Sequence, residues 1–513
     1  MRSAHSPRFA ALAVVVAMLV WQTLARQPSV EATLPLRPLP RESRPFPHGI
    51  SNANAPQYRE YAQESFADPG TALFFLCVGD PAATYEVVLE GRGTRVTPRF
   101  AAQTEVHSSL TSDCVTEDFP SSQREPEDFT TVIAQVGRGA PLPTSVRSNE
   151  DRPFRLTRRF SFPKAGSRSS LAAEELLESD LLAENPHIRV YVERGTTLEA
   201  SFDGFLETVC ELAGAVVTGS DALGGQCRDV DADGKLSIVL TSRLSEFGGR
   251  GGRLDGCVRW EDFQDFAPRS VGNAADVIFL NPEVPDRAQL FAVLAHEYGH
   301  LIAFTRRGIG LDPTAVPDED WLNEALAHVI EVQLSGQDSN LADRIDEFLR
   351  HPEQSPLVVA SSTRSGLWRD PGSRGAGYLF LEWLVRRSPE ERLARLLRGP
   401  ERGTQLVEAV SGTAFGETWS AWAAHLWSQG IPQRREGTAR RYPAAVDVEL
   451  SRHPLRIAVR GMSLCYLSAA THLPGGTIAV TLPADAIWLE GWAQRDRVVG
   501  APLASDHRDP QYR

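Results

Sequence analysis

The stretch Phe291-Ala-Val-Leu-Ala-His296-Glu297-Tyr-Gly-His300-Leu-Ile-Ala-Phe304 is the most informative part of this sequence. Its apolar residues predict a buried helix. His296 and His300 are four positions apart, which places both imidazoles on one face of that helix with Cβ atoms about 6 Å apart. Two ring nitrogens at that separation suit one Zn²⁺ ion, with Zn–N distances of roughly 2.0–2.1 Å.

Two glutamates extend this motif. Glu297 lies beside His296 and is predicted to act as a general base on the open side of the metal. Glu324, in Trp321-Leu-Asn-Glu324, comes 24 positions after His300 and is predicted to be the third ligand. Three protein ligands and a water are typical of catalytic zinc. The alternative, ordinary core histidines, is disfavoured because polar side chains buried on an apolar helix are costly unless they bind something.

The acids between the two motifs are weaker candidates for the third ligand. Glycines and prolines predict a break between one helix at about 286–306 and a second at about 318–334. The residues that predict this break are Gly308, Gly310, Pro313 and Pro317. The acids in or beside the break are Asp312, Asp318, Glu319 and Asp320. None of them is embedded in an apolar helix that would hold a ligand rigidly, so Glu324 is preferred.

Three more residues of the second helix are candidates for supporting roles. Asn323 and Glu331 are predicted to support the metal ligands. Glu331 lies seven positions after Glu324, on the same helix face, where its carboxylate can hold the second ring nitrogen of a zinc-ligating histidine. His328 is predicted to lie on the helix surface, with substrate contact as the alternative.

The run from Val293 to Leu334 resembles the hyicolysin family of neutral zinc metallopeptidases. Three further stretches are similar to that family, namely Asp229–Leu240, Asp276–Asn281 and Gly375–Trp383. The resemblance spans about residues 187–430, just under half of the chain. It implies a gluzincin, in which two histidines and a downstream glutamate hold the metal.

The resemblance leaves open which residue stabilises the transition state. Related gluzincins use a tyrosine or a histidine to donate to the developing oxyanion. Family members tend to have an aromatic residue immediately before the Gly-Ala-x-Tyr-Leu-Phe stretch, where this chain has Arg374. Arg374 and Tyr378 are both candidates, although core packing is the favoured role for Tyr378.

A second metal motif precedes the zinc motif. Asp229-x-Asp231-x-Asp233-Gly234 has the oxygen spacing and the glycine of the first half of a Ca²⁺ loop. The twelfth position is Leu240 instead of glutamate, and the chain is predicted to continue into a strand. A simple turn is therefore favoured, with a Ca²⁺ site as the alternative.

Charge and the N-terminus limit the partners and the location. The net charge of −13 argues against nucleic acid or an anionic membrane as a partner. Arg2 and Arg8 precede an apolar run, Phe9–Trp21, and small residues at Thr23–Ala25 suit cleavage. Residues 1–25 are therefore predicted to be a secretory signal peptide, with an uncleaved signal anchor as the alternative. The mature chain is expected to be extracellular or periplasmic.

Six cysteines in an exported chain predict three disulfides. Of the 15 possible pairings, Cys77 with Cys114 and Cys227 with Cys257 are the candidate pairs, and the sequence does not decide between pairings. Cys210 and Cys465 are left over, with no physical reason to join them. Zinc binding by cysteines is a weaker alternative because no Cys-x-x-Cys pair occurs.

The 513 residues suggest about three domains of α+β class. We expect a Pro-rich linker at 26–50, an N-terminal β domain at 51–165, a catalytic domain at 170–435 and a C-terminal β domain at 440–513. The catalytic domain is predicted to be a zincin-like, two-lobed metallopeptidase domain, flanked by the small β domains. It begins with a short helix at Ser170–Leu182, followed by a sheet, the zinc helix and a helical lobe. The N-terminal β domain could be a prodomain, a binding module or a structural appendage.

These observations predict a secreted zinc metalloendopeptidase that acts on proteins or peptides. Two alternatives remain, a non-catalytic zincin-like binding module and a zinc aminopeptidase. The missing family-type aromatic at Arg374 favours the first alternative, whereas an intact Glu297 argues against it. The second shares the Trp-Leu-Asn-Glu motif, but this chain has no Gly-Ala-Met-Glu-Asn-like segment to bind a substrate N-terminus. The sequence does not indicate an oligomeric state.

Overall fold

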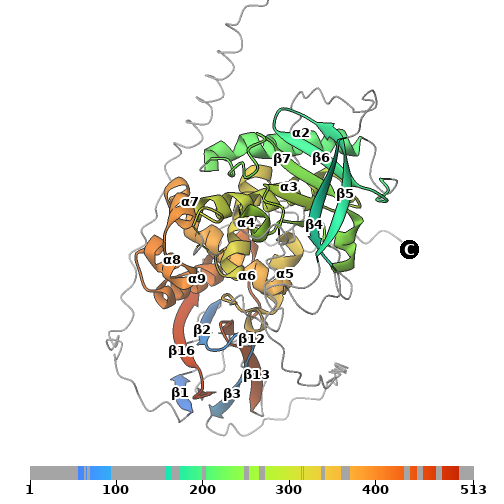
Figure 1. The fold of residues 1–513 in the computed structure, drawn as a ribbon. Helices are drawn as coiled ribbons and strands as arrows, with labels where there is room; N and C mark the ends of the chain where they lie inside the picture. The colour runs from blue at the N-terminus through green and yellow to red at the C-terminus, as the bar shows by residue number, and fades with distance from the viewer. Residues whose placement is uncertain are drawn as a thin grey trace, which may run out of the picture. The chain divides into compact units, whose positions relative to one another are not determined.

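A computed structural model of the chain shows a mixed α+β fold (Figure 1). All described residues belong to one unit, Asn54–Arg513. They are 56–93, 156–164, 174–198, 204–247, 254–264, 272–359, 370–432, 440–447, 454–468 and 476–495, with gaps at 63–64, 66–69, 224, 313–314, 316, 337–340 and 387. The predicted signal peptide and Pro-rich linker lie outside them. Within the described residues, no helix is long and apolar enough to cross a membrane.

A six-stranded mixed sheet precedes the zinc-motif helix in the sequence, with the order β4-β5-β6-β7-β9-β8. The middle strands β6, β7 and β9 run parallel to one another. The strand β5 is antiparallel to β6, β4 is antiparallel to β5, and β8 is antiparallel to β9. The bounds are β4 Thr157–Pro163, β5 Glu174–Glu184, β6 Ile188–Glu193, β7 Leu236–Leu240, β8 Gly256–Cys257 and β9 Val277–Leu280.

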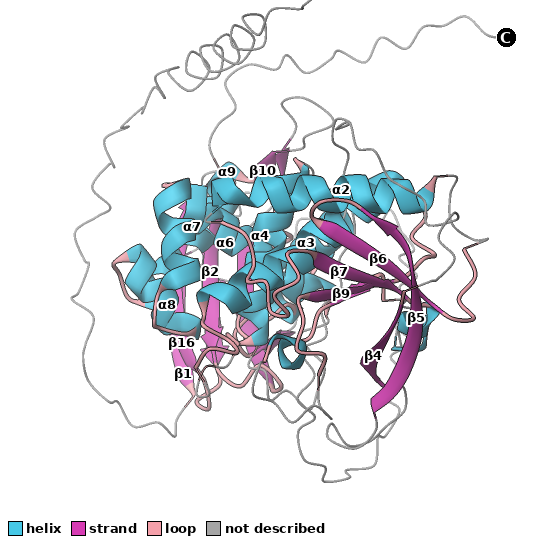
Figure 2. Cartoon of the chain, turned by 45° about the horizontal axis from the view of Figure 1, so that its top comes forward, coloured by secondary structure: helices cyan, strands magenta, loops and turns pink. Residues whose placement is uncertain are grey.

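This sheet is strongly curled (Figure 2), and its strands β7 and β9 are buried on both faces. Phe162 of β4 and Phe279 of β9 have ring centroids 4.8 Å apart although three strands separate them in the sheet. The opposite face carries Ile238 and Leu280, which pack in one core with α2 (Phe205–Gly219) and α3 (Arg287–Arg306). Burial on both faces explains why β7 is an unbroken apolar run apart from Ser237.

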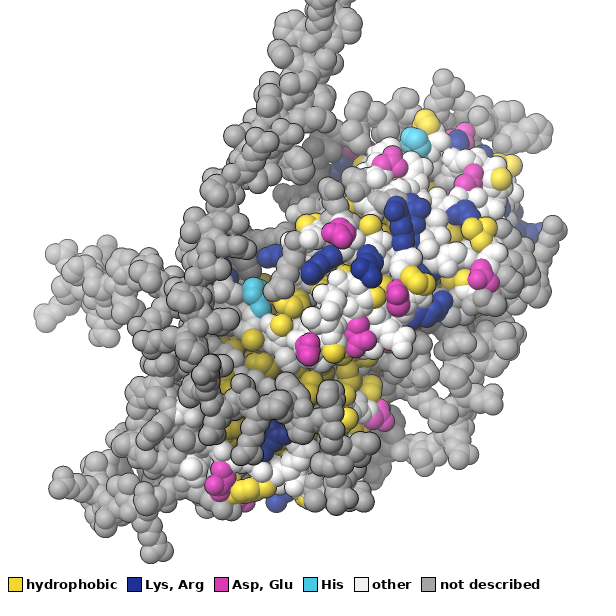
Figure 3. All heavy atoms as spheres, turned by 90° about the vertical axis from the view of Figure 1, so that its left-hand side faces the viewer, with side chains coloured by type: hydrophobic (Ala, Val, Ile, Leu, Met, Phe, Trp, Pro, Cys, Tyr) yellow, Lys and Arg dark blue, Asp and Glu magenta, His cyan; other side chains and the backbone are white. Residues whose placement is uncertain are grey.

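The remainder of the central region is helical, as the sequence predicts. The helix α4 packs against α3, and α6 packs against both α4 and α5. Their bounds are α4 Asp320–Ser335, α5 Ala342–Arg350, α6 Pro371–Arg386, α7 Pro389–Arg398, α8 Gly403–Ser411 and α9 Phe415–Gln429. Among the described side chains on the face drawn in Figure 3, acidic and basic groups are interspersed.

The predicted N-terminal and C-terminal β regions contribute strands to the same two sheets instead of forming two separate domains. One sheet has the order β1-β15-β3-β13 and the other β12-β14-β2-β16. Their strands are β1 Gln57–Ala62, β2 Thr71–Val78, β3 Thr84–Gly93, β12 Val446–Asp447, β13 Leu455–Arg460, β14 Leu464–Ser468, β15 Gly476–Leu482 and β16 Ile487–Gln494. Apolar residues from both sheets, such as Phe75 and Val480, share one core, so the arrangement is a β-sandwich built from both ends of the chain. A short ribbon, β10 (Ile431–Pro432) with β11 (Arg440–Arg441), precedes β12.

Two predictions for local structure are wrong. The segment predicted as a helix at Ser170–Leu182 forms β5, which pairs with β4 on one side and β6 on the other. Leu177 and Leu181 of β5 point into the core inside the curled sheet. The stretch Phe154–Phe162, placed by sequence in the N-terminal β domain, instead contributes β4 to the same sheet.

The predicted disulfide between Cys227 and Cys257 is also wrong. Cys77, Cys210, Cys227, Cys257 and Cys465 are free thiols. Cys257 points into the core inside the curled sheet, whereas Cys227 packs against the core on the opposite face, so the sheet separates them. Cys114, the predicted partner of Cys77, lies outside the described residues.

Candidate functional site

The helix α3 carries the His-Glu-x-x-His motif in the middle of the molecule. Its N-cap residue Asp286 accepts a hydrogen bond from the amide of Gln289 at 2.7 Å, which fixes the start of the helix. From Leu290 to Phe304 every residue is buried, because α3 lies between the sheet and α4. Gly299 lets the two helices approach closely, since a Cβ there would lie 3.3 Å from Cα of Ala327.

Three potential ligand atoms converge where α3 meets α4. Nε2 of His296 is 3.2 Å from Nε2 of His300 and 3.7 Å from Oε2 of Glu324. All three ligand atoms lie within 4.8 Å of one another. Tetrahedral zinc with bonds of 2.0–2.1 Å places its ligand atoms roughly 3.3–3.4 Å apart. The donor set and its spacing therefore fit a zinc ion held by two histidines and one glutamate.

The two histidines have the protonation that a metal ligand needs. Burial lowers the pKa of His296 to about 4, although the neighbouring Glu331 raises it in part. Burial and the charge of His296 lower the pKa of His300 to about 3. Both rings are therefore neutral at pH 7, with lone pairs available to a cation.

Glu331 supports this arrangement from α4. Its Oε2 is 3.1 Å from Nδ1 of His296 and 2.8 Å from Nδ1 of His328. A carboxylate on Nδ1 favours the tautomer of His296 with a proton there, so Nε2 is the bare nitrogen that faces His300 and Glu324. Asn323 is also buried, and its side-chain oxygen, as a hydrogen-bond acceptor for the protonated ring, raises the pKa of His300 in part.

Glu297 is fully buried, and neither carboxylate oxygen has a hydrogen-bond partner of ordinary geometry among the described residues. Burial raises its pKa well above the usual value, and the charge of Glu324 raises it further. The strand β8 lies directly against it, because a Cβ on Gly256 would be 2.8 Å from Oε1 of Glu297. A carboxyl group coupled to Glu324 therefore lies next to His296 on the helix that carries both histidines.

The helix α6 brings Arg374 into contact with the candidate ligands. Nη2 of Arg374 donates to Oε2 of Glu324, and both side chains are buried. Two glycines allow this approach. A Cβ on Gly375 would lie 2.2 Å from the carbonyl oxygen of Arg344 in α5, and one on Gly377 would lie 3.3 Å from Cβ of Ala325 in α4. The Gly-Ala-Gly stretch thus seats α6 against both neighbouring helices.

Tyr378 is buried in the core shared by these helices, in keeping with the packing role favoured from the sequence. His328, in contrast, is fully buried instead of lying on the helix surface, so that prediction is wrong. Its ring centroid is 4.4 Å from that of His296, and its Nε2 has no hydrogen-bond partner among the described residues.

Two of the acids in the break between α3 and α4 have other partners. Asp318 forms an ion pair with Arg307, and Glu319 accepts a hydrogen bond from the indole of Trp321 at 2.7 Å. Among the described residues, the groups of His, Cys, Asp and Glu with metal-ligand spacing include Glu324 but none of these loop acids.

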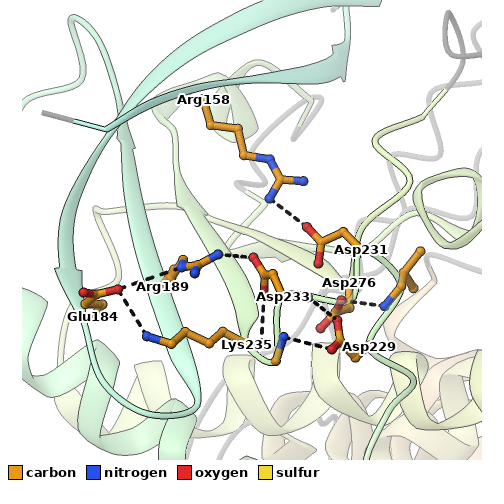
Figure 4. Close-up of polar contacts among 10 residues, drawn as sticks. Arg158, Glu184, Arg189, Asp229, Asp231, Asp233, Lys235 and Asp276 are labelled. Carbon is orange, nitrogen blue, oxygen red and sulfur yellow. Dashed lines mark hydrogen bonds and ion pairs between the residues drawn. The ribbon is translucent and has the colours of Figure 1, made fainter.

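The aspartates of the predicted calcium loop divide into two groups (Figure 4). Asp229 and Asp231 come together with Asp276, whose carboxylate precedes β9. Asp233 is turned away, because it pairs with Arg189 and accepts a hydrogen bond from the amide of Lys235 at 2.9 Å. Asp231 pairs with Arg158 through Oδ2, whereas its buried Oδ1 has no partner among the described residues.

Asp276 is a site residue that the motif alone does not reveal. It lies 45 positions after Asp231, and only the parallel pairing of β7 with β9 brings the two segments together. Its Oδ1 accepts from the amide of Val230 at 3.0 Å. Burial raises its pKa to about 7, and the charges of Asp231 and Asp229 contribute to that rise.

Comparisons with known proteins do not add a family. No family model matches the chain. No curated protein sequence matches it significantly. The candidate function therefore depends on the residues and their geometry.

Proposed function

We propose that the chain is a secreted zinc-dependent endopeptidase with a zincin-like catalytic region of the gluzincin type. The observation that carries this proposal is the convergence of His296 Nε2, His300 Nε2 and Glu324 Oε2, with Glu297 next to His296 on the same buried helix. Glu331 on Nδ1 of His296 adds to it, since a carboxylate on the outer nitrogen is usual for a zinc-ligating histidine.

The roles of the residues follow from this geometry. Zinc, when bound, supplies Lewis acidity that polarises a peptide carbonyl and acidifies a water. Glu297 would accept a proton from that water and return it to the leaving amine. His296, His300 and Glu324 hold the metal. Burial around Glu297 keeps other water away from this proton transfer.

The strand β8 offers a means of binding an extended substrate. It is the last strand of the sheet, with β9 on one side and no strand on the other among the described residues. A peptide that adds to this edge through main-chain hydrogen bonds would pass next to Gly256, and therefore next to Glu297. Main-chain recognition of this kind suits an enzyme that cleaves within a chain.

The test is cleavage of an amino-blocked peptide library by the purified mature chain. We expect internal cleavage that a chelator abolishes and zinc restores. Release of residues only from free N-termini would instead favour the aminopeptidase. One equivalent of bound zinc with no hydrolysis of any library member would favour the non-catalytic binding module.

For the second metal, we propose that Asp229, Asp231 and Asp276 take a calcium ion, with Asp276 in the place that the sequence motif gives to Asp233. A raised pKa near 7 means that Asp276 carries its full charge only above neutral pH in the absence of a cation. Calcium is therefore expected to raise the melting temperature more at pH 8 than at pH 5. Asp276→Asn should remove this increase in thermal scans. An equal calcium effect in the variant would reject the site.

A further inference from the structure

Two arginines lie among the carboxylates around the candidate zinc ligands. Arg374 donates to Oε2 of Glu324, the same oxygen that lies nearest to Nε2 of His296. Arg344 lies on α5. Its backbone carbonyl oxygen is close to Gly375, where a Cβ would lie 2.2 Å from it. Burial and the charge of Arg374 lower the pKa of Arg344 to about 10, whereas the charges of Glu331 and Glu324 oppose this shift. Two guanidinium groups and two carboxylates of α4, α5 and α6 are therefore electrostatically coupled.

The formal charges of these four groups cancel, and Glu297 is a further carboxyl group coupled to them. A dication held by Glu324 therefore meets two guanidinium charges that offset the charges of Glu324 and Glu331. The repulsion between such a cation and a guanidinium on the same carboxylate is strong, because a buried pair of charges is weakly screened. A carboxylate that also accepts from a guanidinium donates less electron density to a metal.

We propose that Arg374 is a positioning residue that presents Oε2 of Glu324 to the metal and, through its charge, weakens zinc binding while leaving the bound ion a stronger Lewis acid. This inference rests on the proposed zinc-dependent function. Arginine suits the role because its planar fork holds a carboxylate in one orientation and stays charged in a buried site. A neutral donor at this position would orient Glu324 without opposing the metal.

The experiment measures zinc affinity of the full mature chain by competition with a chelator. Arg374→Met removes the charge at similar length, whereas Arg374→Lys keeps the charge and loses the fork. We expect zinc to bind at least about tenfold more tightly to Arg374→Met, and within about threefold of wild type to Arg374→Lys. Arg386→Met, on the exposed side of the same helix, is the matched control and should leave zinc affinity unchanged.

Two further readouts separate this role from simple packing. In the cobalt-substituted protein, the visible absorption bands should shift in Arg374→Met and not in Arg386→Met, since only the former changes the charge on a ligand. The kcat for an amino-blocked peptide should fall in Arg374→Met with little change in KM. Arg374→Gln, which is neutral and can still donate, replaces the methionine variant if that variant does not fold.

Weaker zinc binding in Arg374→Met than in the wild type would overturn the inference. If Arg374 only orients Glu324, its loss should weaken zinc binding by about 10–100-fold, as is usual when an outer partner of a metal ligand is removed. Equal affinities in the methionine and lysine variants would also contradict a role for charge. Failure of the proposed function is distinguishable, because the wild-type chain would then bind no zinc or would bind it equally well after Glu324→Gln.

Discussion

A Glu297→Gln variant is expected to keep one zinc per chain while its kcat/KM for peptide hydrolysis falls by roughly 10²–10⁴-fold, the usual contribution of a general acid–base group. The amide has nearly the same shape as the carboxylate but cannot accept the proton of the attacking water. His296, His300 and Glu324 are untouched, so metal content should not change. Metal analysis and hydrolysis of an amino-blocked fluorogenic peptide provide the measurement. Retained activity with full zinc content would reject Glu297 as the base.

The same variant should be more stable than the wild type when zinc is removed. The folded protein raises the pKa of Glu297, chiefly through burial, so the folded state binds its proton more tightly than the unfolded chain does. The resulting stability is fully present below the ordinary carboxyl pKa and is lost as the pH rises through the raised value. Glutamine does not ionise, so the variant does not lose this stability as the pH rises. Urea unfolding of the metal-free proteins should therefore show little difference near pH 4.5 and a gain of about 1–3 kcal/mol at pH 8.

Replacement of Glu324 by alanine, unlike Glu297→Gln, should weaken zinc binding. It removes a candidate ligand atom and the carboxylate that accepts from the buried Arg374. We expect zinc affinity to fall by more than about 100-fold, the upper end of the loss seen when only a partner of a ligand is removed. Peptide hydrolysis should fall with it at zinc concentrations that saturate the wild type. Equilibrium dialysis with zinc, followed by the peptide assay, measures both quantities.

A neighbour on the same helix provides the control for that result. Asp320 is one turn before Glu324, is also mostly buried, and is not among the groups with metal-ligand spacing in the described part of the chain. Asp320→Asn should bind zinc with wild-type affinity. If it lost zinc while Glu324→Ala kept it, the third ligand would have to be reassigned.

The local structure of the site could be predicted from the sequence because its signals are local. The apolar run around His296 and His300 predicts α3, and the Trp-Leu-Asn-Glu324 stretch predicts α4 to within two residues at each end. The seven-residue spacing from Glu324 to Glu331 predicts a shared helix face, and the Glu331 carboxylate does lie against the ring of His296. Each of these inferences depends on helix periodicity alone.

The features that depend on distant pairing could not be predicted in this way. The segment that forms β5 is rich in glutamate and leucine, which favour a helix, but hydrogen bonding to β4 and β6 outweighs that preference. Asp276 joins Asp229 and Asp231 only through the register of β7 with β9. The charge of Arg344 acts on Glu324 and Glu331 because α5 packs on α6. In the sequence, that close packing is indicated by the glycines of α6.

The sandwich built from both ends of the chain has a consequence for the order of folding. Its two central strands from the N-terminal side, β2 and β3, each pair on both sides with strands that come after α9. During synthesis these strands cannot pair fully until the whole region from β4 to α9 has emerged. Contacts so distant in sequence form slowly, and unpaired strand edges invite aggregation in the interval. The sandwich therefore completes last, and a chain that ends prematurely, even beyond α9, would leave its first strands without partners.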